Sequence, residues 1–207
     1  MAKLRFRLEA IRHNAKIIMR HARERGIDIA FVNKVSCGLP ALAEAVMPLG
    51  FSQIADSRVE NLAGYGKKYQ RLLLRPMENA EESVRFSDIS LESEITSLKK
   101  LDLAAEKQGK RHKVILMIDL GDLREGIFFK NREEIFAFAR EAKRLSNIEL
   151  AGIGTNLTCF GGVLPSDENL GVLSGLARDL RLETGLALPI VSGGNSSSLP
   201  LLLEGRL

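Results

Sequence analysis

Lys34 is the residue best suited to covalent chemistry, because it directly follows the apolar segment IDIAFVN at residues 27–33. Such a segment is typical of a buried strand, and an ammonium at its end is expected to be partly desolvated. Desolvation lowers the pKa of a lysine, and the neutral amine can then attack a carbonyl carbon to form a Schiff base. The alternative is a lysine that extends from the strand end into water and does no chemistry.

Glycines and serines form a second candidate site in SGGNSSS, residues 192–198, which follows the apolar stretch Leu188–Val191. Small residues allow backbone N–H groups to close around an oxyanion, so phosphate is the first ligand to consider. Ordinary surface loops have the same composition. The run by itself therefore leaves both interpretations open.

Two further polar runs also follow strand-like segments. DLGDLREG, residues 119–126, contains three acids and Arg124, which could form a magnesium site, a substrate clamp or a solvated loop with internal ion pairs. TNLTCFGG, residues 155–162, offers amide, hydroxyl and thiol groups. Cys159 would need an adjacent base to act as a nucleophile, and the histidines are distant along the chain. The cysteine and histidine spacings match no zinc site, so we expect no bound metal.

Strand-like and helical patterns alternate along the whole chain. Strand-like runs begin near residues 28, 51, 71, 88, 113, 149 and 188, and each is followed by a helical pattern. This alternation predicts an α/β protein with a parallel sheet, either doubly wound or closed into a barrel, and both architectures build their sites where strands end. A doubly wound dinucleotide fold should have G-x-G-x-x-G after its first strand, where this sequence has NKVSCG. We therefore predict a parallel (β/α) barrel that is one strand short of eight.

Composition excludes several other classes of protein. The net charge of +4 comes from 30 basic and 26 acidic residues, which are mostly interspersed and give little reason to expect nucleic acid as a partner. No stretch approaches the roughly 20 apolar residues of a membrane span, and the basic N-terminus lacks the apolar segment of a secretory signal. Two cysteines are too few for a disulfide framework. We expect a cytoplasmic protein without a membrane partner.

Taken together, the motifs resemble one family. AFVNKVSCG, ADSRVENL, LLLRPM, MIDLGDLREGIF, GIGTNLTCFG and LPIVSGGNSSSL occur in the order and at about the spacing seen in the ornithine racemase branch of the alanine racemase-like, fold-type III enzymes. The similarity covers nearly all 207 residues. It implies a TIM-like barrel that binds pyridoxal 5'-phosphate and an activity that interconverts L- and D-amino acids, either ornithine, another basic amino acid or an alanine-like substrate.

The resemblance also assigns roles to individual residues. Lys34 would form the aldimine with the cofactor and exchange the Cα proton on one face. Arg124 would contact the phenolic oxygen, and Asn156 would lie against the pyridine ring, where alanine racemases usually have histidine. The phosphate would be bound by the run at the end of the last strand, through Ser192, Gly193, Gly194, Asn195 and Ser196.

The sequence departs from the family at its end. The family continues with an eighth strand, whose arginine faces the pyridine nitrogen, and with a β-domain that supplies a tyrosine to the partner subunit as the second base. Tyr65 and Tyr69 are poor substitutes for that tyrosine, since they fall in a predicted helix and loop. We therefore expect residues 9–207 to be the cofactor-binding barrel, truncated before its last strand, with little activity and an altered or weakened homodimer.

Two related expectations concern the missing parts. KLRFRL, residues 3–8, alternates like a half-buried strand, and we expect residues 1–8 to be an orphan strand of the absent β-domain. The open edges of the barrel would then pair with this segment or with another chain. The alternative to a racemase fragment is a single-domain pyridoxal-phosphate carrier, which shares the barrel and the lysine but has no β-domain.

Overall fold

A computed structural model describes residues 4–75 and 79–207 of the chain. Seven strands form one curved sheet in the order β1-β2-β3-β4-β5-β7-β8, and every pair in it is parallel. They are β1 (Ala30–Val32), β2 (Gln53–Asp56), β3 (Arg71–Leu73), β4 (Ile89–Glu92), β5 (His112–Asp119), β7 (Ile148–Gly154) and β8 (Ile190–Ser192). The two-residue strand β6 (Ile127–Phe128) pairs only with the end of β5.

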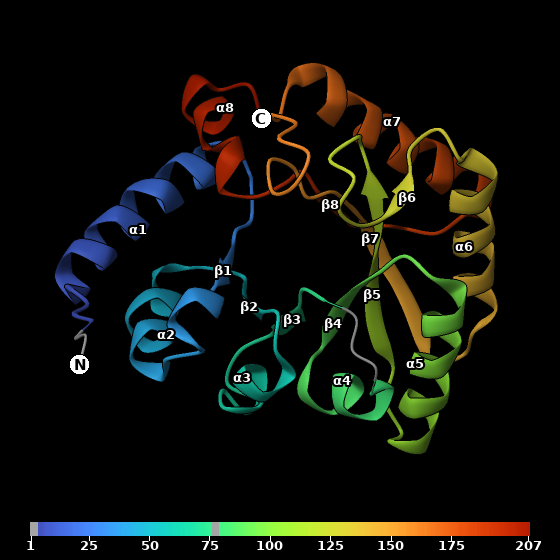
Figure 1. Cartoon of the computed structure of the whole chain (residues 1–207), viewed down its shortest axis with the longest axis horizontal. Helices are drawn as coiled ribbons and strands as arrows, with labels where there is room; N and C mark the ends of the chain where they lie inside the picture. The colour runs from blue at the N-terminus through green and yellow to red at the C-terminus, as the bar shows by residue number, and fades with distance from the viewer. Residues whose placement is uncertain (1–3, 76–78) are drawn as a thin grey trace.

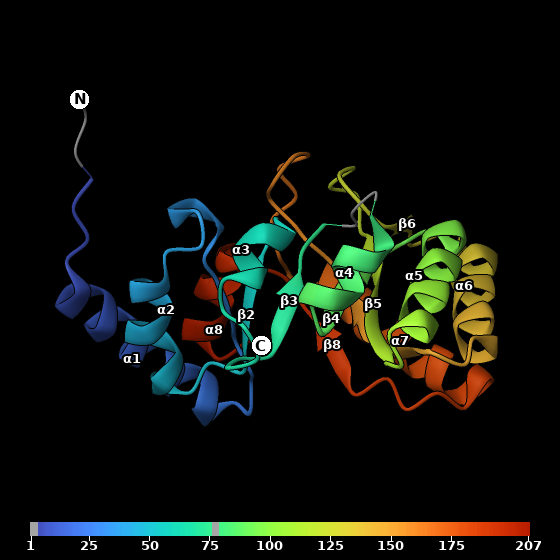
Figure 2. The same cartoon turned by 90° about the horizontal axis from the view of Figure 1, so that it is seen from below.

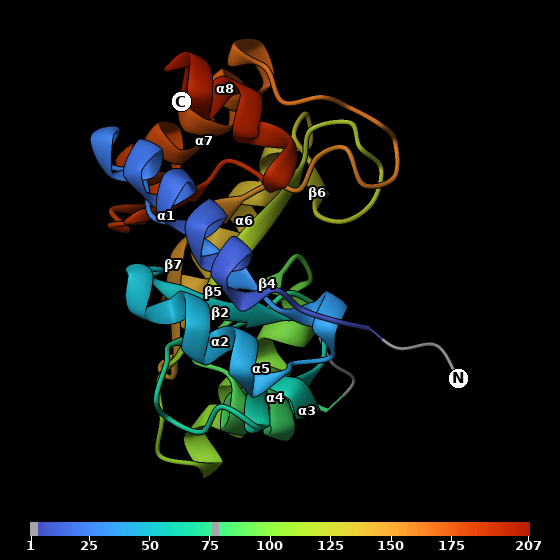
Figure 3. The same cartoon turned by 90° about the vertical axis from the view of Figure 1, so that its left-hand side faces the viewer.

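One helix precedes the first strand and the others follow strands, and together they lie on the outside of the curved sheet (Figure 1). They are α1 (Leu8–Glu24), α2 (Pro40–Val46), α3 (Val59–Ala63), α4 (Ala80–Phe86), α5 (Ile95–Lys107), α6 (Arg132–Arg144), α7 (Asp167–Thr184) and α8 (Leu199–Glu204). Within the described residues β1 pairs only with β2 and β8 only with β7, so the sheet does not close. Helices α1 and α8 contact each other on this open side (Figures 1 and 3). The predicted parallel barrel with seven of eight strands is confirmed.

The sheet is buried on both faces, which explains the continuous apolar runs in its strands. The larger core lies between the sheet and α5, α6 and α7, where Phe138 and Ile153 are fully buried. A second cluster on the concave face includes Leu72, Leu91 and Ile115 from successive strands. Burial of each large side chain of this kind contributes about 1.5–3 kcal/mol, so the sheet is a rigid support for the loops at its ends.

The N-terminal segment differs from the prediction. Residues 4–7 form neither helix nor strand, and Leu8 is already the first residue of α1. In Figure 2 the blue chain before α1 leads away from the rest of the molecule. A strand needs a partner for its backbone groups, and none of the described residues pairs with this segment, whereas Leu8 packs beside Ala15 and Val46 in helical register. The predicted strand is therefore wrong at Leu8, while Lys3 lies outside the described residues and membership of residues 1–8 in another domain stays a prediction.

The loops that follow β1, β5 and β7 lie at one edge of the sheet, as expected for parallel strands. Figure 2 shows them at the top of the molecule, in blue after β1, yellow-green after β5 and orange after β7. The tip of β8 belongs to the same edge, because β8 runs parallel to β7 with Ser192 beside Gly154. In the described part of the chain, no helix has the length and apolar character needed to cross a membrane.

Candidate functional site

Lys34 begins a short 3-10 turn, Lys34–Ser36, directly after β1. Its side chain is exposed, so the expected desolvation is not observed. The physical reason is that β1 is an edge strand that ends at Val32, and Asn33, at 3% exposed, takes the buried position at its end. The amine of Lys34 therefore lies in solvent beside the end of the edge strand β1, and the sheet does not enclose it.

The turn that carries Lys34 is fixed from its buried side by Asn33. The Asn33 amide nitrogen Nδ2 donates to the hydroxyl of Tyr65 at 2.6 Å and to the carbonyl oxygen of Leu39 at 3.1 Å. The backbone carbonyl oxygen of Asn33 accepts a hydrogen bond from the backbone N–H of Gly38 at 3.2 Å. Burial raises the pKa of Tyr65 more than the bond from Asn33 lowers it, so Tyr65 keeps its proton at neutral pH. Asn33 was not among the residues predicted for the site.

Glu125 links two of the predicted site residues. Its oxygen Oε1 lies 3.9 Å from Nε of Arg124 and accepts a hydrogen bond from Nδ2 of Asn156. The loops after β5 and β7 thus bring Arg124 and Asn156 to the same carboxylate. The side chains of Arg124 and Glu125 are 20% and 21% exposed, so both remain accessible at the edge of the sheet. The sequence marked Glu125 only as one acid of a polar run.

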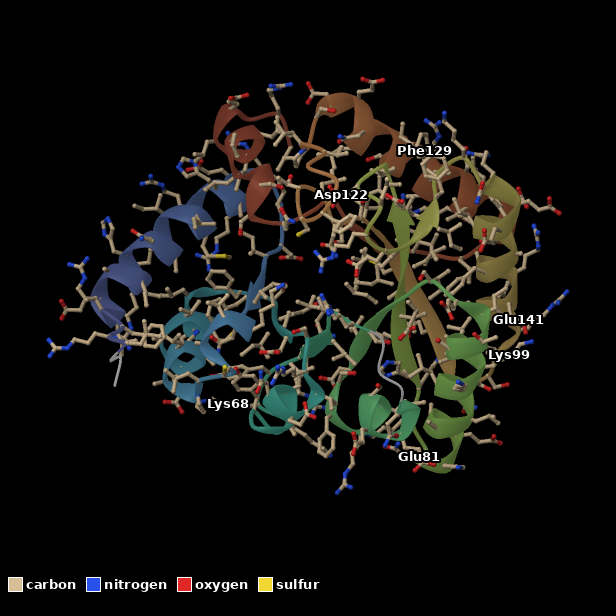
Figure 4. The ribbon with its side chains drawn as sticks, in the orientation of Figure 1. Lys68, Glu81, Lys99, Asp122, Phe129 and Glu141 are labelled. Atoms are coloured by element: carbon tan, nitrogen blue, oxygen red, sulfur yellow. The ribbon has the colours of Figure 1, made fainter. Side chains whose placement is uncertain are left out.

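Asp122 holds the loop after β7 in place. It is 1% exposed, and Figure 4 shows it where the loops after β5 and β7 meet. Its carboxylate accepts four backbone N–H groups, from Thr158 (3.0 Å), Cys159 (3.2 Å), Phe160 (3.0 Å) and Val163 (3.2 Å). Burial raises the pKa of Asp122, but these four donors outweigh it, and the net shift is downward. The loop that contains Asn156 is therefore anchored by a charged, fully bonded carboxylate.

The acids of residues 119–126 thus serve the loops around them. Asp119 Oδ1 accepts hydrogen bonds from the backbone N–H groups of Gly121 at 2.8 Å and Leu123 at 3.1 Å, within the loop after β5. The bonds of Asp122, in contrast, join that loop to the loop after β7. Among residues 4–75 and 79–207, no three His, Cys, Asp or Glu side chains are grouped to hold a metal ion. Asp119 and Asp122 accept backbone N–H groups, and Arg124 and Glu125 form an internal ion pair of the kind expected in a loop, while the role of Arg124 as a substrate clamp stays a prediction.

The loop after β8 presents free backbone donors. In the described part of the chain, the N–H groups of Gly193, Gly194 and Asn195 donate no hydrogen bond. Gly194 has φ +130°, which side chains rarely allow. The side chain of Asn195 is already used, since Nδ2 donates to the carbonyl oxygen of Leu157 at 2.7 Å and Oδ1 accepts from the N–H of Ser197 at 2.9 Å. Any anion here would meet backbone N–H groups and the exposed Ser196, and not the Asn195 side chain.

The predicted site residues therefore fall into two groups. Arg124, Asn156 and the loop 192–196 are joined through Glu125 and through the bond from Asn195 to Leu157. Lys34 lies in the turn that follows β1, and no hydrogen bond among the described residues joins this turn to those loops. Tyr65 and Tyr69 pack in the cluster around Leu62 and Leu73, and the hydroxyl of Tyr65 accepts a hydrogen bond from Asn33.

Sequence comparison identifies the family. A model of the alanine racemase N-terminal domain matches residues 6–204. The chain belongs to this family. Ornithine racemase from Acetoanaerobium sticklandii is 41% identical over 208 residues, which is 99% of this chain and 58% of that protein. The chain thus spans little more than half the length of this relative.

Two solved structures share the fold of this chain. Alanine racemase from Streptomyces lavendulae superposes with a TM-score of 0.79 at 18% identity, over 97% of this chain and 54% of that one. PipY from Synechococcus elongatus PCC7942, solved with PLP bound, superposes with a TM-score of 0.73 at 18% identity and covers 92% of this chain and 93% of its own. The open sheet of this alanine racemase N-terminal domain therefore corresponds to a known barrel.

Proposed function

We propose that this chain is the pyridoxal-phosphate-binding barrel of an amino-acid racemase that acts on ornithine or a similar basic amino acid. The observation that carries the proposal is the composition of one sheet edge. An exposed lysine, a guanidinium and a side-chain amide that share one carboxylate, and three backbone N–H groups without a partner among the described residues all follow strands of the same parallel sheet. The identity of 41% to an ornithine racemase supports the choice of substrate class.

This donor set suits the chemical groups of pyridoxal phosphate. Nζ of Lys34 would attach to the aldehyde carbon. The N–H groups of Gly193, Gly194 and Asn195 would bind the phosphate, with Ser192 and Ser196 beside them, because unpaired donors in a glycine-containing turn bind oxyanions. Arg124 would face the phenolic oxygen and Asn156 the ring.

The residues of this chain would then divide the work of racemisation. Bound pyridoxal phosphate spreads the negative charge that develops when the Cα proton of an amino acid leaves. Once the amino group of the substrate has taken its place on the aldehyde carbon, the freed amine of Lys34 would accept and return that proton on one face as a general base and acid. Glu125 would hold Asn156 and Arg124 in place, and Asp122 would keep the loop of Asn156 from moving. By resemblance to the family, the base for the other face would be a tyrosine that the β-domain of the partner subunit supplies.

A second candidate function is that of a pyridoxal-phosphate carrier without racemase activity. The observation that favours it is the match to 93% of the PipY chain, which has about the length of this one. Both functions would attach the cofactor to Lys34, and they differ in whether Lys34 also exchanges the α-proton of an amino acid.

Self-association is part of the proposal, because two sheet edges are open. β1 and β8 each have a strand partner on one side only within the described residues, and Val32 and Val191 on them are 42% and 37% exposed. Unpaired strand edges with apolar side chains favour pairing with another chain.

Two measurements on the purified chain with ornithine and added pyridoxal phosphate test the proposed function. One follows deuterium uptake at Cα, and the other follows optical rotation. We expect slow uptake with retained configuration, because a single base serves one face. Absence of uptake above that of free cofactor favours the carrier. Racemisation that keeps pace with deuterium uptake would contradict the assignment of the second base to a residue outside this chain.

A further inference from the structure

We infer that Asn33 and Tyr65 are positioning residues that present Lys34 to the cofactor. The inference rests on the role proposed above for Lys34. Nζ of Lys34 makes no hydrogen bond or ion pair with any described residue, and its side chain is exposed. The position of the amine is therefore set by the backbone of its turn, and what holds that turn decides where the amine lies.

Asn33 holds the turn with every polar group that it has. Its backbone N–H donates to the carbonyl oxygen of Ala55 at 2.9 Å, which continues the sheet by one residue beyond β1. Its carbonyl oxygen and side chain then bond to the far end of the turn at Gly38 and Leu39, while the hydroxyl of Ser36 donates to Oδ1. An amide is the side chain that can donate twice and accept at one site of this size.

Tyr65, which follows α3 in the sequence, completes this arrangement. It is 7% exposed, and its hydroxyl is the partner of the second N–H of Asn33. Without that hydroxyl the Asn33 amide would have a buried donor with no acceptor and would be free to turn away from Leu39.

The turn also depends on outside support because its backbone is unusual. Cys37 and Gly38 have φ angles of 52° and 71°, and this left-handed conformation is disfavoured for a residue such as Cys37. Gly38 lies so close to α3 that an added Cβ would come within 2.8 Å of Cβ of Asn61. The turn is thus pressed against α3 and held there by the pair Asn33 and Tyr65.

Tyr65→Phe tests the inference, with Tyr69→Phe as the matched control. Tyr69 packs edge-on against Tyr65, with ring centroids 6.5 Å apart, but its hydroxyl has no hydrogen-bond partner among the described residues. Both variants lose one buried hydroxyl from the same aromatic pair, and only the first loses a bond to Asn33. Asn33→Ala removes the same hydrogen bond by deleting its donor.

Two readouts separate positioning from a general loss of stability. Hydrogen exchange of the chain without cofactor reports the turn itself, and we expect faster exchange at Gly38 and Leu39 in Tyr65→Phe but not in Tyr69→Phe. Borohydride trapping followed by mass spectrometry reports the adduct on Lys34. At a fixed, limiting concentration we expect trapped pyridoxal phosphate to fall about 3- to 10-fold, the factor that one hydrogen bond is worth. Trapped formaldehyde, which has no phosphate to align, should change by less than twofold on the same lysine.

Failure of the inference and failure of the proposed function give different results. Unchanged exchange and an unchanged Lys34 adduct in Tyr65→Phe would overturn the inference alone. Equal losses with pyridoxal phosphate and formaldehyde would also overturn it, because they indicate damage without a directional effect. An unmodified chain whose pyridoxal phosphate is trapped on another lysine would overturn the proposed function, and with it the role of the turn.

Discussion

The side-chain nitrogen Nδ2 of Asn195 lies 2.7 Å from the carbonyl oxygen of Leu157 and so joins the loops that follow β8 and β7. Through this bond the loop with free N–H groups is tied to the loop that carries Asn156. Asn195 therefore connects the loop whose N–H groups suit an anion with the loop whose Asn156 would face the pyridine ring of the cofactor.

Asn195→Asp should weaken the retention of pyridoxal phosphate. Aspartate keeps the acceptor for the N–H of Ser197 but cannot donate to Leu157, and its charge opposes a phosphate. We expect affinity to fall roughly tenfold, because the lost bond between neutral groups is worth about 0.5–1.5 kcal/mol and the new negative charge adds repulsion toward the phosphate. Fluorescence or absorbance titration measures the change. Ser197→Ala, which leaves the bond to Leu157 in place, is the control and should lose much less; equal affinities for all three proteins would refute this role of Asn195.

Asp122→Asn should loosen the loop after β7. The amide keeps the size of the carboxylate, but its NH₂ group faces backbone donors that need an acceptor. We expect the free energy of unfolding to fall by about 2 kcal/mol, as is usual when buried donors lose their acceptor. Urea denaturation measures this loss, and limited proteolysis near Phe160, which is 77% exposed, reports the loop. Asp119→Asn, whose carboxylate accepts two donors from its own loop, should cost less, and a greater loss there than in Asp122→Asn would contradict this account.

Glu92 is a buried acid at the end of β4. It is 2% exposed; its oxygen Oε1 accepts from the hydroxyl of Ser90 at 2.9 Å, and Oε2 has no partner among the described residues. Burial raises the pKa of Glu92 to about 7, although the bond from Ser90 opposes this shift. Because the folded-state pKa lies above that of the unfolded chain, the folded state binds more protons between the two values. Stability is therefore retained below the unfolded pKa and is lost as the pH rises through about 7.

Glu92→Gln should remove this loss. We expect the variant to gain stability over the unmodified chain as the pH rises from 5 to 8, by up to about 3 kcal/mol, which follows from a shift of roughly two to three pH units. Urea denaturation at several pH values measures the difference. Glu94→Gln, which removes a neighbouring exposed charge, is the control and should show a much smaller gain. Parallel stability curves for Glu92→Gln and the unmodified chain would show that Glu92 does not titrate in this range.

The strands and the site edge could be predicted because their signals are local. Apolar runs bounded by glycine and polar residues placed seven strands near their observed starts, and parallel order placed the loops together. The two residues of β6 carry no such periodic signal. The desolvation expected for Lys34 was inferred only from the apolar run before it, and a run of this kind does not show whether Lys34 or its neighbour Asn33 takes the buried position at the end of β1.

Asn33, Asp122 and Glu125 were missed as supporting residues for a different reason. Their long-range hydrogen bonds join hydroxyl, amide and backbone groups that are 31 to 41 residues apart in the sequence. Asn33 and Tyr65 are separated by 32 residues, and Asp122 and Val163 by 41. Backbone N–H groups have no signature in a sequence, so their acceptors are recognised only after folding. The strand expected up to Leu8 failed because alternation alone cannot supply a pairing partner.

The most direct test of the proposed attachment of pyridoxal phosphate to Lys34 is borohydride trapping on the 207-residue chain. Mass spectrometry then identifies the modified peptide. We expect a new absorption band on adding the cofactor and one dominant modified residue, Lys34, in the peptide that contains NKVSCG. Lys34→Arg should abolish both, while Lys68→Arg, which changes an exposed lysine elsewhere, should leave both intact. Trapping spread over many lysines, or a dominant adduct on a lysine other than Lys34, would contradict the account.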